Sequence, residues 1–448
     1  MQFSSIHTMV VKATGRLALL SICSIMPAVY ADTSDAAGEV AGESVEGATV
    51  AAVNAGEVAA SVPSERVTEE LSDEASASPS EEKIIPWAWG NKWLQGTINR
   101  AGGDDEFDPA DGIDWGYVPN PVYSSEKKLG LGLVVFGLFV ADEESLNVEN
   151  VKPSQIVFKG FGTTNGAKGF ETNLRSLFRA DAYRLNVDVE FADTPEVFYG
   201  LGIEPSQDEA NELIYDHQGQ NFQAHGLKRV FGDTFLGLGV RYHDNQAEDF
   251  RGPNIGAAAV LTDSTSVGIT GHWLHDSRDH QDNPSTGWLL QFDYATFNES
   301  FGSDTDFDQL EFRYSGYRPI DTFLNQRTAT LAWQVQGHLS EGNVPWDRLT
   351  LLGGSRQLRG YEQGRYRGHQ KVLAQVELRQ PLTGRHGMVT WVGVGTLSED
   401  ISDLGEERWL PSIGVGYRLR IKEKINLRFD VGFGRNDKGV YVSVNEVF

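Results

Sequence analysis

The sequence is first informative through what it lacks. Its 448 residues include one cysteine, Cys23, and that residue lies in a stretch that is typical of a cleaved export signal. The mature chain is therefore expected to have no disulfide and no thiol chemistry. Beyond this stretch no window holds about 18 consecutive apolar residues, which excludes a transmembrane helix.

Basic residues are also scarce. The chain has 63 acidic and 38 basic residues, and this balance argues against a nucleic-acid partner, whose phosphates need a basic face. A polar average composition does not exclude a membrane protein. A transmembrane β-barrel presents only alternate residues to lipid, so its sequence averages as polar.

Residues 1–31 are predicted to be a signal peptide. Lys12 and Arg16 form its basic part, an apolar run follows over residues 17–26, and Val29-Tyr30-Ala31 supplies the small-residue cleavage pattern. A lipoprotein signal is the alternative, but Ile22 is not the small residue that a lipobox places before its cysteine.

Residues 32–85 are low in complexity and contain no aromatic residue. They hold 13 acidic residues against Arg66 and Lys83, a net charge of −13 + 2 = −11. Such a segment cannot bury enough apolar surface to offset its ordering entropy, so we expect a disordered acidic linker. An acidic docking tail is the alternative.

Residues 86–126 differ in composition from the preceding segment and are predicted to be an aromatic and acidic pre-barrel segment. Trp87, Trp89 and Trp93 are suited to a membrane interface or a barrel mouth. The acidic run over residues 104–114 lacks the ligand spacing of a calcium loop. We therefore expect a solvated turn there and no metal.

From residue 127 to Phe448 the apolar residues alternate with polar ones, clearly over residues 183–191, 288–294, 310–314 and 425–433. The polar face carries full charges in strand after strand, whereas the apolar face is large and aromatic. This pattern favours an all-β fold, a transmembrane antiparallel β-barrel with a wet lumen, over a soluble sandwich. At about 10 residues per strand there is room for roughly 14–18 strands.

The last strand supports the same fold. Val440, Val442, Val444 and Phe448 are expected to share one face, which resembles the terminal signal that outer-membrane barrels present to the cell's barrel-insertion machinery. Glu446 interrupts that face. The barrel-insertion machinery is therefore one expected partner, acting through the strand that ends in Phe448.

The stretch from Leu351 to Arg379 places arginines among glycines. We expect a loop that folds back into the lumen and binds a carboxylate of the wall. In residues 371–379 the alternation turns Gln375, Glu377 and Arg379 inward, so Glu377 is a suitable partner for Arg359 in a charge-assisted pair. The alternative is a basic extracellular loop that binds lipopolysaccharide phosphates.

Three stretches in order carry a family resemblance. They are Pro119-Asn120-Pro121-Val122-Tyr123 with the strand that follows, His275-Asp276-Ser277-Arg278-Asp279 with Asn283-Pro284 and Gly287, and Leu358-Arg359-Gly360-Tyr361 with residues 374–379. Over residues 119–448 the chain resembles the BamA/TamA superfamily of bacterial surface antigen barrels. The resemblance implies 16 strands and a long sixth extracellular loop inside the lumen.

The resemblance also implies two groups of site residues. The loop-lock motif consists of Arg359, Gly360, Tyr361 and Glu377. The strand-end motif consists of Asp276, Arg278, Asp279, Pro284 and Gly287.

Two departures from the family pattern stand out. Gly393 occupies the position where the next strand usually carries an aspartate that also meets the loop arginine, so the lock is expected to rest mainly on Glu377. Residues 32–85 are expected to be disordered and residues 86–126 leave only 41 positions, so the periplasmic POTRA domains of the family, each of about 75 residues, do not fit. The chain looks like a barrel-only branch, in which client delivery by the usual route is in doubt.

Three functions compete. The first is insertion or translocation of proteins, or outer-membrane assembly, through a lateral seam, with Gly130, Gly132 and Gly137 weakening the first strand. The alternative role for these glycines is to make room for the loop. The second function is a passive or gated channel, for which the following inward residues are expected to line the lumen or to form a structural salt-bridge network: Arg184, Asp188, Glu190, Glu311, Arg313, Arg428 and Asp430.

An enzyme is the third possibility and is not expected. His272, His275 and His280 lie near Asp276 and Asp279, but no nucleophile with a base and an orienting group accompanies them. No catalytic residue and no cofactor are predicted. The expected location is the outer membrane of a Gram-negative bacterium, with outer-membrane lipids, lipopolysaccharide and other outer-membrane or exported proteins as partners.

Overall fold

The computed structural model of the chain describes residues 112–124, 127–146, 152–321, 327–422 and 425–448. The predicted signal peptide 1–31, the predicted linker 32–85 and the tryptophan cluster of the segment 86–126 lie outside the described residues. No helix in the described ranges is long and apolar enough to cross a membrane.

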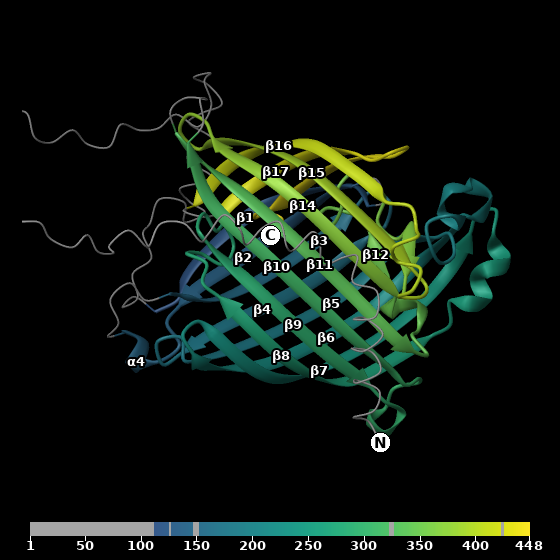
Figure 1. Cartoon of the computed structure of the whole chain (residues 1–448), viewed down its shortest axis with the longest axis horizontal. Helices are drawn as coiled ribbons and strands as arrows, with labels where there is room; N and C mark the ends of the chain where they lie inside the picture. Colours follow the sequence, from purple (N-terminus) through teal and green to yellow (C-terminus); the bar gives the residue numbers. More distant parts are fainter. Residues whose placement is uncertain (1–111, 125–126, 147–151, 322–326, 423–424) are drawn as a thin grey trace, which may run out of the picture. The chain divides into compact units, whose positions relative to one another are not determined.

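The described residues form a closed antiparallel barrel of 16 strands (Figure 1), as predicted. The strands of the barrel wall are β1 (Asp114–Ser124), β2 (Lys128–Phe139), β3 (Ser154–Thr163), β4 (Lys168–Phe178), β5 (Tyr183–Phe198), β6 (Leu213–Phe231), β7 (Thr234–Arg251), β8 (Ser264–Asp276), β9 (Gly287–Phe297), β10 (Phe307–Asp321), β11 (Thr328–Gly342), β14 (Gln370–Pro381), β15 (His386–Ser398), β16 (Leu410–Lys422), β17 (Ile425–Phe433) and β18 (Lys438–Val444).

The remaining elements are short and lie in the connections. They are the two-stranded sheet of β12 (Thr350–Leu352) and β13 (Tyr366–Gly368), the helix α4 (Glu143–Leu146) and the 3-10 helices η3 (Pro205–Gln207), η4 (Glu209–Asn211), η5 (Ile255–Val260), η6 (Glu299–Phe301) and η7 (Trp346–Arg348).

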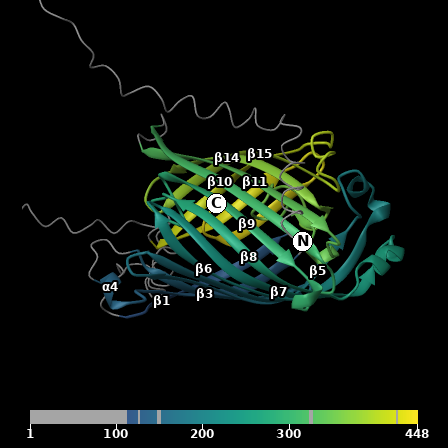
Figure 2. The same cartoon turned by 60° about the horizontal axis from the view of Figure 1, so that its bottom comes forward.

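Each wall strand pairs with its neighbours in sequence, except that β11 pairs with β14 around a long connection that contains β12 and β13. We call the end of the barrel where β1 begins and β18 ends the terminal end. The opposite end, which holds the long connections 199–212, 252–263 and 343–369, is the loop end. Figures 1 and 2 show the tilted strands running between these two ends.

Side chains on the outer face of the wall are apolar and exposed, while polar side chains fill the inside. Leu131 and Leu238 are each 78% exposed on the outer face, whereas Gln375 and Glu377 are buried on the inner face. This alternation is the one expected for strands that face lipid on one side and a lumen on the other.

The barrel begins earlier than the predicted boundary at residue 127. Residues 114–124 form β1 and pair with β2 over the whole strand, from Asp114↔Leu138 to Ser124↔Lys128. The family resemblance indicated the start of the barrel at Pro119–Tyr123, whereas the period-2 pattern, which Pro119 and Pro121 interrupt, gave the boundary at residue 127.

The predicted position of the three seam glycines is therefore wrong. Gly130, Gly132 and Gly137 lie on β2, which pairs with β1 and β3 and is not a seam strand. A Cβ atom added to Gly130 would lie 2.6 Å from the main-chain oxygen of Gly162 on β3. A Cβ atom added to Gly132 would lie 2.8 Å from the main-chain oxygen of Gly160 on the same strand. Two of these glycines thus allow β3 to approach closely.

The chain end also departs from prediction. β18 ends at Val444, and Asn445 adopts φ +66°, so Phe448 does not continue the outer face of Val440 and Val442. Its ring lies 6.3 Å from that of Tyr317, and its main-chain oxygen accepts a hydrogen bond of 2.7 Å from Arg379. Both partners point into the lumen, so the last residues turn inward.

Candidate functional site

The connection between β11 and β14, residues 343–369, enters the lumen, and we call it the lumen loop. Its base is the small β12–β13 sheet, which pairs from Thr350↔Gly368 to Leu352↔Tyr366. Apolar side chains of the loop pack with apolar side chains of the wall and of the β5–β6 connection in one buried cluster of Ile203, Leu352, Leu358, Tyr361, Tyr366, Leu373, Leu397 and Leu410. Burial of this surface from water holds the loop inside the barrel.

The tip of the loop has an unusual backbone. Leu358 has φ +47° and Gly360 has φ +111°. A Cβ atom on residue 360 would lie 2.7 Å from the main-chain nitrogen of Phe433, so only glycine fits there. The left-handed conformation of Leu358 costs about 1–3 kcal/mol and persists because the surrounding contacts fix it.

Arg359 lies between Leu358 and Gly360 in the sequence. Its side chain is fully buried and binds two carboxylates. Its Nη2 donates to Glu377 on β14, and its Nη1 donates to Asp430 on β17 at 2.7 Å. Its guanidinium carbon also lies 3.7 Å from the ring centroid of Trp391 on β15. Charge-assisted bonds and a cation–π contact are both strongest where water is excluded.

The prediction that Gly393 leaves the arginine with a single main carboxylate is wrong. Asp430 supplies the second one from β17, two strands further along the wall. Gly393 faces the tip of the loop, and a Cβ atom there would lie 3.6 Å from the Leu358 side chain, an ordinary contact distance. In this chain the second carboxylate of the lock therefore comes from β17.

Gly360 and Tyr361 attach the tip to the strands beside the seam. The Gly360 amide donates to the Tyr441 hydroxyl on β18 at 3.0 Å. The Tyr361 hydroxyl donates to the Pro411 oxygen at 2.6 Å and accepts from the Arg435 amide at 2.9 Å. Together these contacts hold β16, β17 and β18 against the loop.

A second clamp holds the loop near the loop end and was not predicted. Arg367 donates to Glu196 at 2.8 Å and to the Tyr215 hydroxyl at 2.7 Å, while Arg365 donates to Glu209 at 2.7 Å. The hydrogen bond from Arg365 lowers the pKa of the Glu209 carboxyl from its ordinary value. The arginines of Gly364-Arg365-Tyr366-Arg367-Gly368 were the only sequence signal for this clamp.

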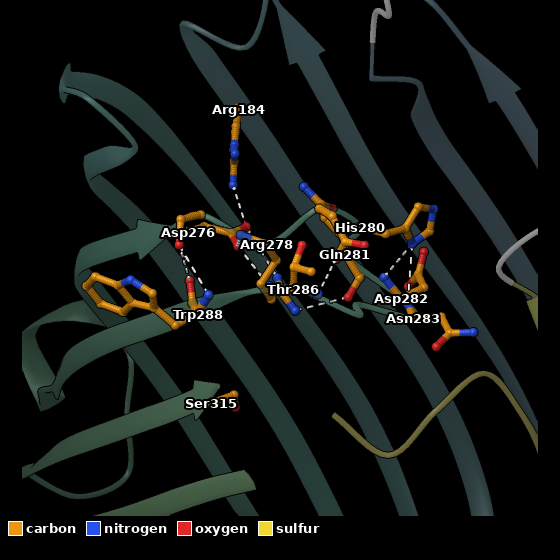
Figure 3. A network of polar contacts seen from close by, with 12 residues as sticks. Arg184, Asp276, Arg278, His280, Gln281, Asp282, Asn283, Thr286, Trp288 and Ser315 are labelled. Atoms are coloured by element: carbon orange, nitrogen blue, oxygen red, sulfur yellow. Dashed lines mark hydrogen bonds and ion pairs between the residues drawn. The ribbon is translucent and has the colours of Figure 1, made fainter. Parts of the chain in front are cut away.

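The strand-end residues form a network at the terminal end (Figure 3). Asp276, the last residue of β8, accepts bonds from Arg278 Nε at 2.8 Å and from Arg184 Nη1 at 3.2 Å. Arg278 Nη1 also donates to the Gln281 oxygen at 3.0 Å. Arg184 is held in turn by Asp181 at 2.6 Å, so the turn after β8 is tied to β5.

Asp279, Pro284 and Gly287 shape the same turn. Asp279 accepts from the amides of Ser285 at 2.9 Å and Thr286 at 3.1 Å, and Pro284 is buried. Gly287 has φ +89°, and a Cβ atom there would lie 2.2 Å from the Ser277 oxygen. The role of this motif is thus to close the β8–β9 turn tightly.

The three histidines are not arranged as a hydrolytic site. His272 contacts Asp293 at 2.7 Å, and His275 contacts the Thr234 hydroxyl at 3.0 Å. His280 accepts main-chain bonds from Asp282 and Asn283 in the turn of Figure 3. No group of histidine, cysteine and acidic residues in the described part of the chain is suited to a metal ion.

Three of the predicted lumen carboxylates accept hydrogen bonds from neighbouring side chains. Glu311 accepts from Arg241 at 3.0 Å, and Asp188 accepts from Gln223 at 2.9 Å. Glu190 accepts from Asn221 at 3.2 Å. Such pairs stiffen the inner wall. Arg428 is less well paired, since its Nε lies 3.6 Å from Asp430 and makes no hydrogen bond.

These features define a class of protein: a 16-stranded transmembrane barrel whose sixth connection at the loop end is locked in the lumen by an arginine. The Omp85 superfamily domain matches residues 161–445. The chain therefore belongs to the Omp85 superfamily, whose barrels are outer-membrane transport and assembly proteins.

Two solved structures are similar to this chain. BamA from Haemophilus ducreyi lacking POTRA domains 1–3 is 13% identical, with 74% of this chain and 70% of that chain covered and a TM-score of 0.48. CdiB from Escherichia coli is also 13% identical, with 81% and 72% covered and a TM-score of 0.48. A search of curated proteins finds no match.

Proposed function

We propose that this outer-membrane barrel assists the insertion or translocation of other proteins by opening between β1 and β18. The observation that carries the proposal is the pairing at this seam. In the described residues β1 and β18 pair at one position, Tyr123↔Val442, whereas β1 pairs with β2 along all of its 11 residues. Opening here breaks fewer main-chain hydrogen bonds than opening anywhere else along the described wall.

The inward turn at the chain end explains the short seam. Tyr123 lies near the end of β1, while Val442 lies near the end of β18. The first residues of β1 therefore extend past Val444, where residues 445–448 leave the wall. This part of β1 contains Pro119 and Pro121. Neither residue has a main-chain N–H group, and residues two apart in a strand would direct these groups to one and the same edge. Proline within sheets is confined to edges, which supports β1 as a strand built to separate.

The lumen loop supports an uneven opening. β18 is attached to the loop through Tyr441, which accepts from Gly360 and donates to the Tyr361 oxygen at 3.3 Å. On β1 the large side chains of Trp115 and Tyr117 are 50% and 43% exposed on the outer face. We infer that β1 moves and that β18 stays with the wall.

A reversible staple tests this function. In a Cys23→Ser background, Tyr123→Cys with Val442→Cys joins the seam, and Val376→Cys with Val392→Cys joins the outer faces of β14 and β15 as the matched control. In reconstituted vesicles we expect the oxidised seam staple to abolish accelerated insertion of a second barrel, reduction to restore it, and the control staple to leave it unchanged. An unstapled protein without acceleration, or a stapled seam with full activity, contradicts the proposal.

A gated channel is the second candidate, favoured by the charged inner wall and by a loop that occupies the lumen. Single-channel recording of Arg359→Ala tests it, because release of the loop should raise the conductance. An unchanged conductance argues against a channel that the loop closes.

We also propose that residues 1–31 are a cleaved export signal and that the loop end faces outward. Long connections gather at that end, as is usual for the outer side of outer-membrane barrels. The apolar outer face of the wall would then contact outer-membrane lipids, with lipopolysaccharide around the loop end. N-terminal sequencing of the mature protein tests the cleavage.

A further inference from the structure

A hollow of about 610 Å³ lies on the outer face of the wall, across β4 to β7 and near the loop end. Two cross-strand rows of side chains form much of its lining. The first row consists of Phe170, Phe191, Gln220 and Asp244, which pair in register from strand to strand. The second row lies nearer the loop end and includes Asp193 and Gln246. Phe170 and Phe191 are 46% and 48% exposed, so their rings are open to a ligand.

The hollow lies where the outer face of the wall changes from apolar to polar. On β5 the outward residues are apolar over residues 183–191 and become polar at Asp193. On β7 they are apolar over residues 236–242 and become polar at Asp244. A tilted strand needs about 9–11 residues to cross a membrane. The apolar runs therefore end at the border of the lipid, and the hollow opens just beyond it.

Three polar side chains of the hollow are available to a ligand. Within the described part of the chain, Gln220, Asp244 and Gln246 make no side-chain hydrogen bond or ion pair with another residue. Gln220 is exposed, and the other two are half-buried, so all three can be reached from solvent. Each glutamine amide offers donors and an acceptor, and the carboxylate offers acceptors.

The charge of the hollow decides which chemistry it suits. Its positive group, Lys168, pairs with Asp193 at 3.1 Å, and Asp244 adds a second carboxylate, so a phosphate would be repelled. An acyl chain would cover the amides and the carboxylate without giving them hydrogen bonds. A neutral sugar meets both kinds of lining: its hydroxyls pair with the polar groups, and its C–H face packs on the exposed phenylalanine rings.

We propose that this hollow binds neutral sugar units of lipopolysaccharide, with Phe170 and Phe191 as the stacking surface and Gln220, Asp244 and Gln246 as hydrogen-bonding groups. The volume lies within the range of about 300–1,000 Å³ that is typical of sites for small molecules. The choice of lipopolysaccharide rests on the proposed outward orientation of the loop end, because its sugars then lie directly above the lipid border. It does not depend on opening of the seam.

The test uses the full mature chain purified in detergent free of lipopolysaccharide. Isothermal titration with the core oligosaccharide of lipopolysaccharide, freed of lipid and phosphate, measures binding by the unaltered protein, Asp244→Ala, Phe191→Leu and Phe433→Leu. Phe433 is the matched control, since it is also 48% exposed but lies on β17, outside the hollow. Asp244→Ala should weaken binding about tenfold and Phe191→Leu about threefold. Phe433→Leu should bind like the unaltered protein.

A second arm tests whether lipopolysaccharide is the source of the sugar. Maltoheptaose, a neutral glucan, is titrated beside the dephosphorylated core and the core that keeps its phosphates. Tighter binding of the dephosphorylated core than of maltoheptaose supports the proposal, whereas equal binding overturns lipopolysaccharide as the ligand. Absence of saturable binding, binding that requires the phosphates, or equal affinity in Asp244→Ala and the unaltered protein overturns the site itself. Because neither a client protein nor a membrane is present, these outcomes are separate from the test of the seam.

Discussion

The two sides of β18 are held in different ways. Towards β17 it pairs from Leu427↔Val444 to Phe433↔Lys438, and its Tyr441 is joined to the tip of the lumen loop. Towards β1 it pairs at one position within the described residues. The loop thus reinforces the wall from β14 to β18. Among the contacts described, it makes no comparable bond across the seam between β18 and β1. Closure of this barrel is concentrated on one side.

The largest expected effect comes from breaking the reinforced side. Arg359→Ala removes one of the two arginine partners of each buried carboxylate, because Glu377 keeps Arg379 and Asp430 keeps Arg418. The expected cost is up to the about 3–5 kcal/mol of a buried ion pair that is broken outright. We expect a lower unfolding temperature in heat-modifiability gels and faster proteolysis of the lumen loop. Arg356→Ala is the control, since Arg356 is exposed in the same loop. Equal stability of the two variants would show that the lock does not hold the loop.

A smaller effect should come from extending the weak side. Asn445→Val disfavours the left-handed backbone that turns the chain inward, by about 1–2 kcal/mol. The straightened end would lengthen β18 along β1, so amide hydrogen exchange in the first half of β1 should slow. Asn445→Gly tolerates the same backbone and should leave exchange as it is. Faster exchange in the valine variant would contradict the account of the short seam.

The smallest effect concerns the clamp at the loop end. The pKa of Glu209 is lower in the folded loop than its ordinary value of 4.5. Its contact with Arg365 therefore stabilises the loop fully above that pH, and the stabilisation is lost as the pH falls through the lowered pKa. In a Cys23→Ser background, a spin label at Ala210→Cys should become more mobile as the pH falls below the ordinary glutamate pKa and through the lowered pKa of Glu209. Adding Glu209→Gln should remove the pH dependence of the label's mobility. If the mobility changes with pH in the same way in both proteins, the clamp is not its cause.

The sequence was sufficient for the barrel and for half of the lock. Period-2 alternation over residues 371–379 turned Glu377 inward, and the loop motif directed Arg359 towards it. Asp430 could not be singled out in the same way, because it alternates with Arg428 among many inward charges of β17 and lies 71 residues from Arg359. Only the closed wall brings that strand to the loop.

The ends of the barrel were less accessible to sequence reasoning. Pro119 and Pro121 hid β1 from the period-2 pattern, since proline is tolerated in a strand only at an edge, and an edge is created by the tertiary fold. At the other end Val440 to Phe448 shows a regular pattern, but the left-handed Asn445 and the lumen arginines override it. In both cases long-range contacts decide against local periodicity.

The lock also implies an order of events during folding. Arg359 and Glu377 are 18 residues apart, whereas Arg359 and Asp430 are separated by 71 residues and Gly360 and Tyr441 by 81. Contacts between near neighbours form before distant ones, because less chain entropy is lost. We expect the loop to dock on β14 first and to wait there for β17 and β18. The tip then acts as a template on which the final strands assemble, so that the barrel closes around a loop already in place.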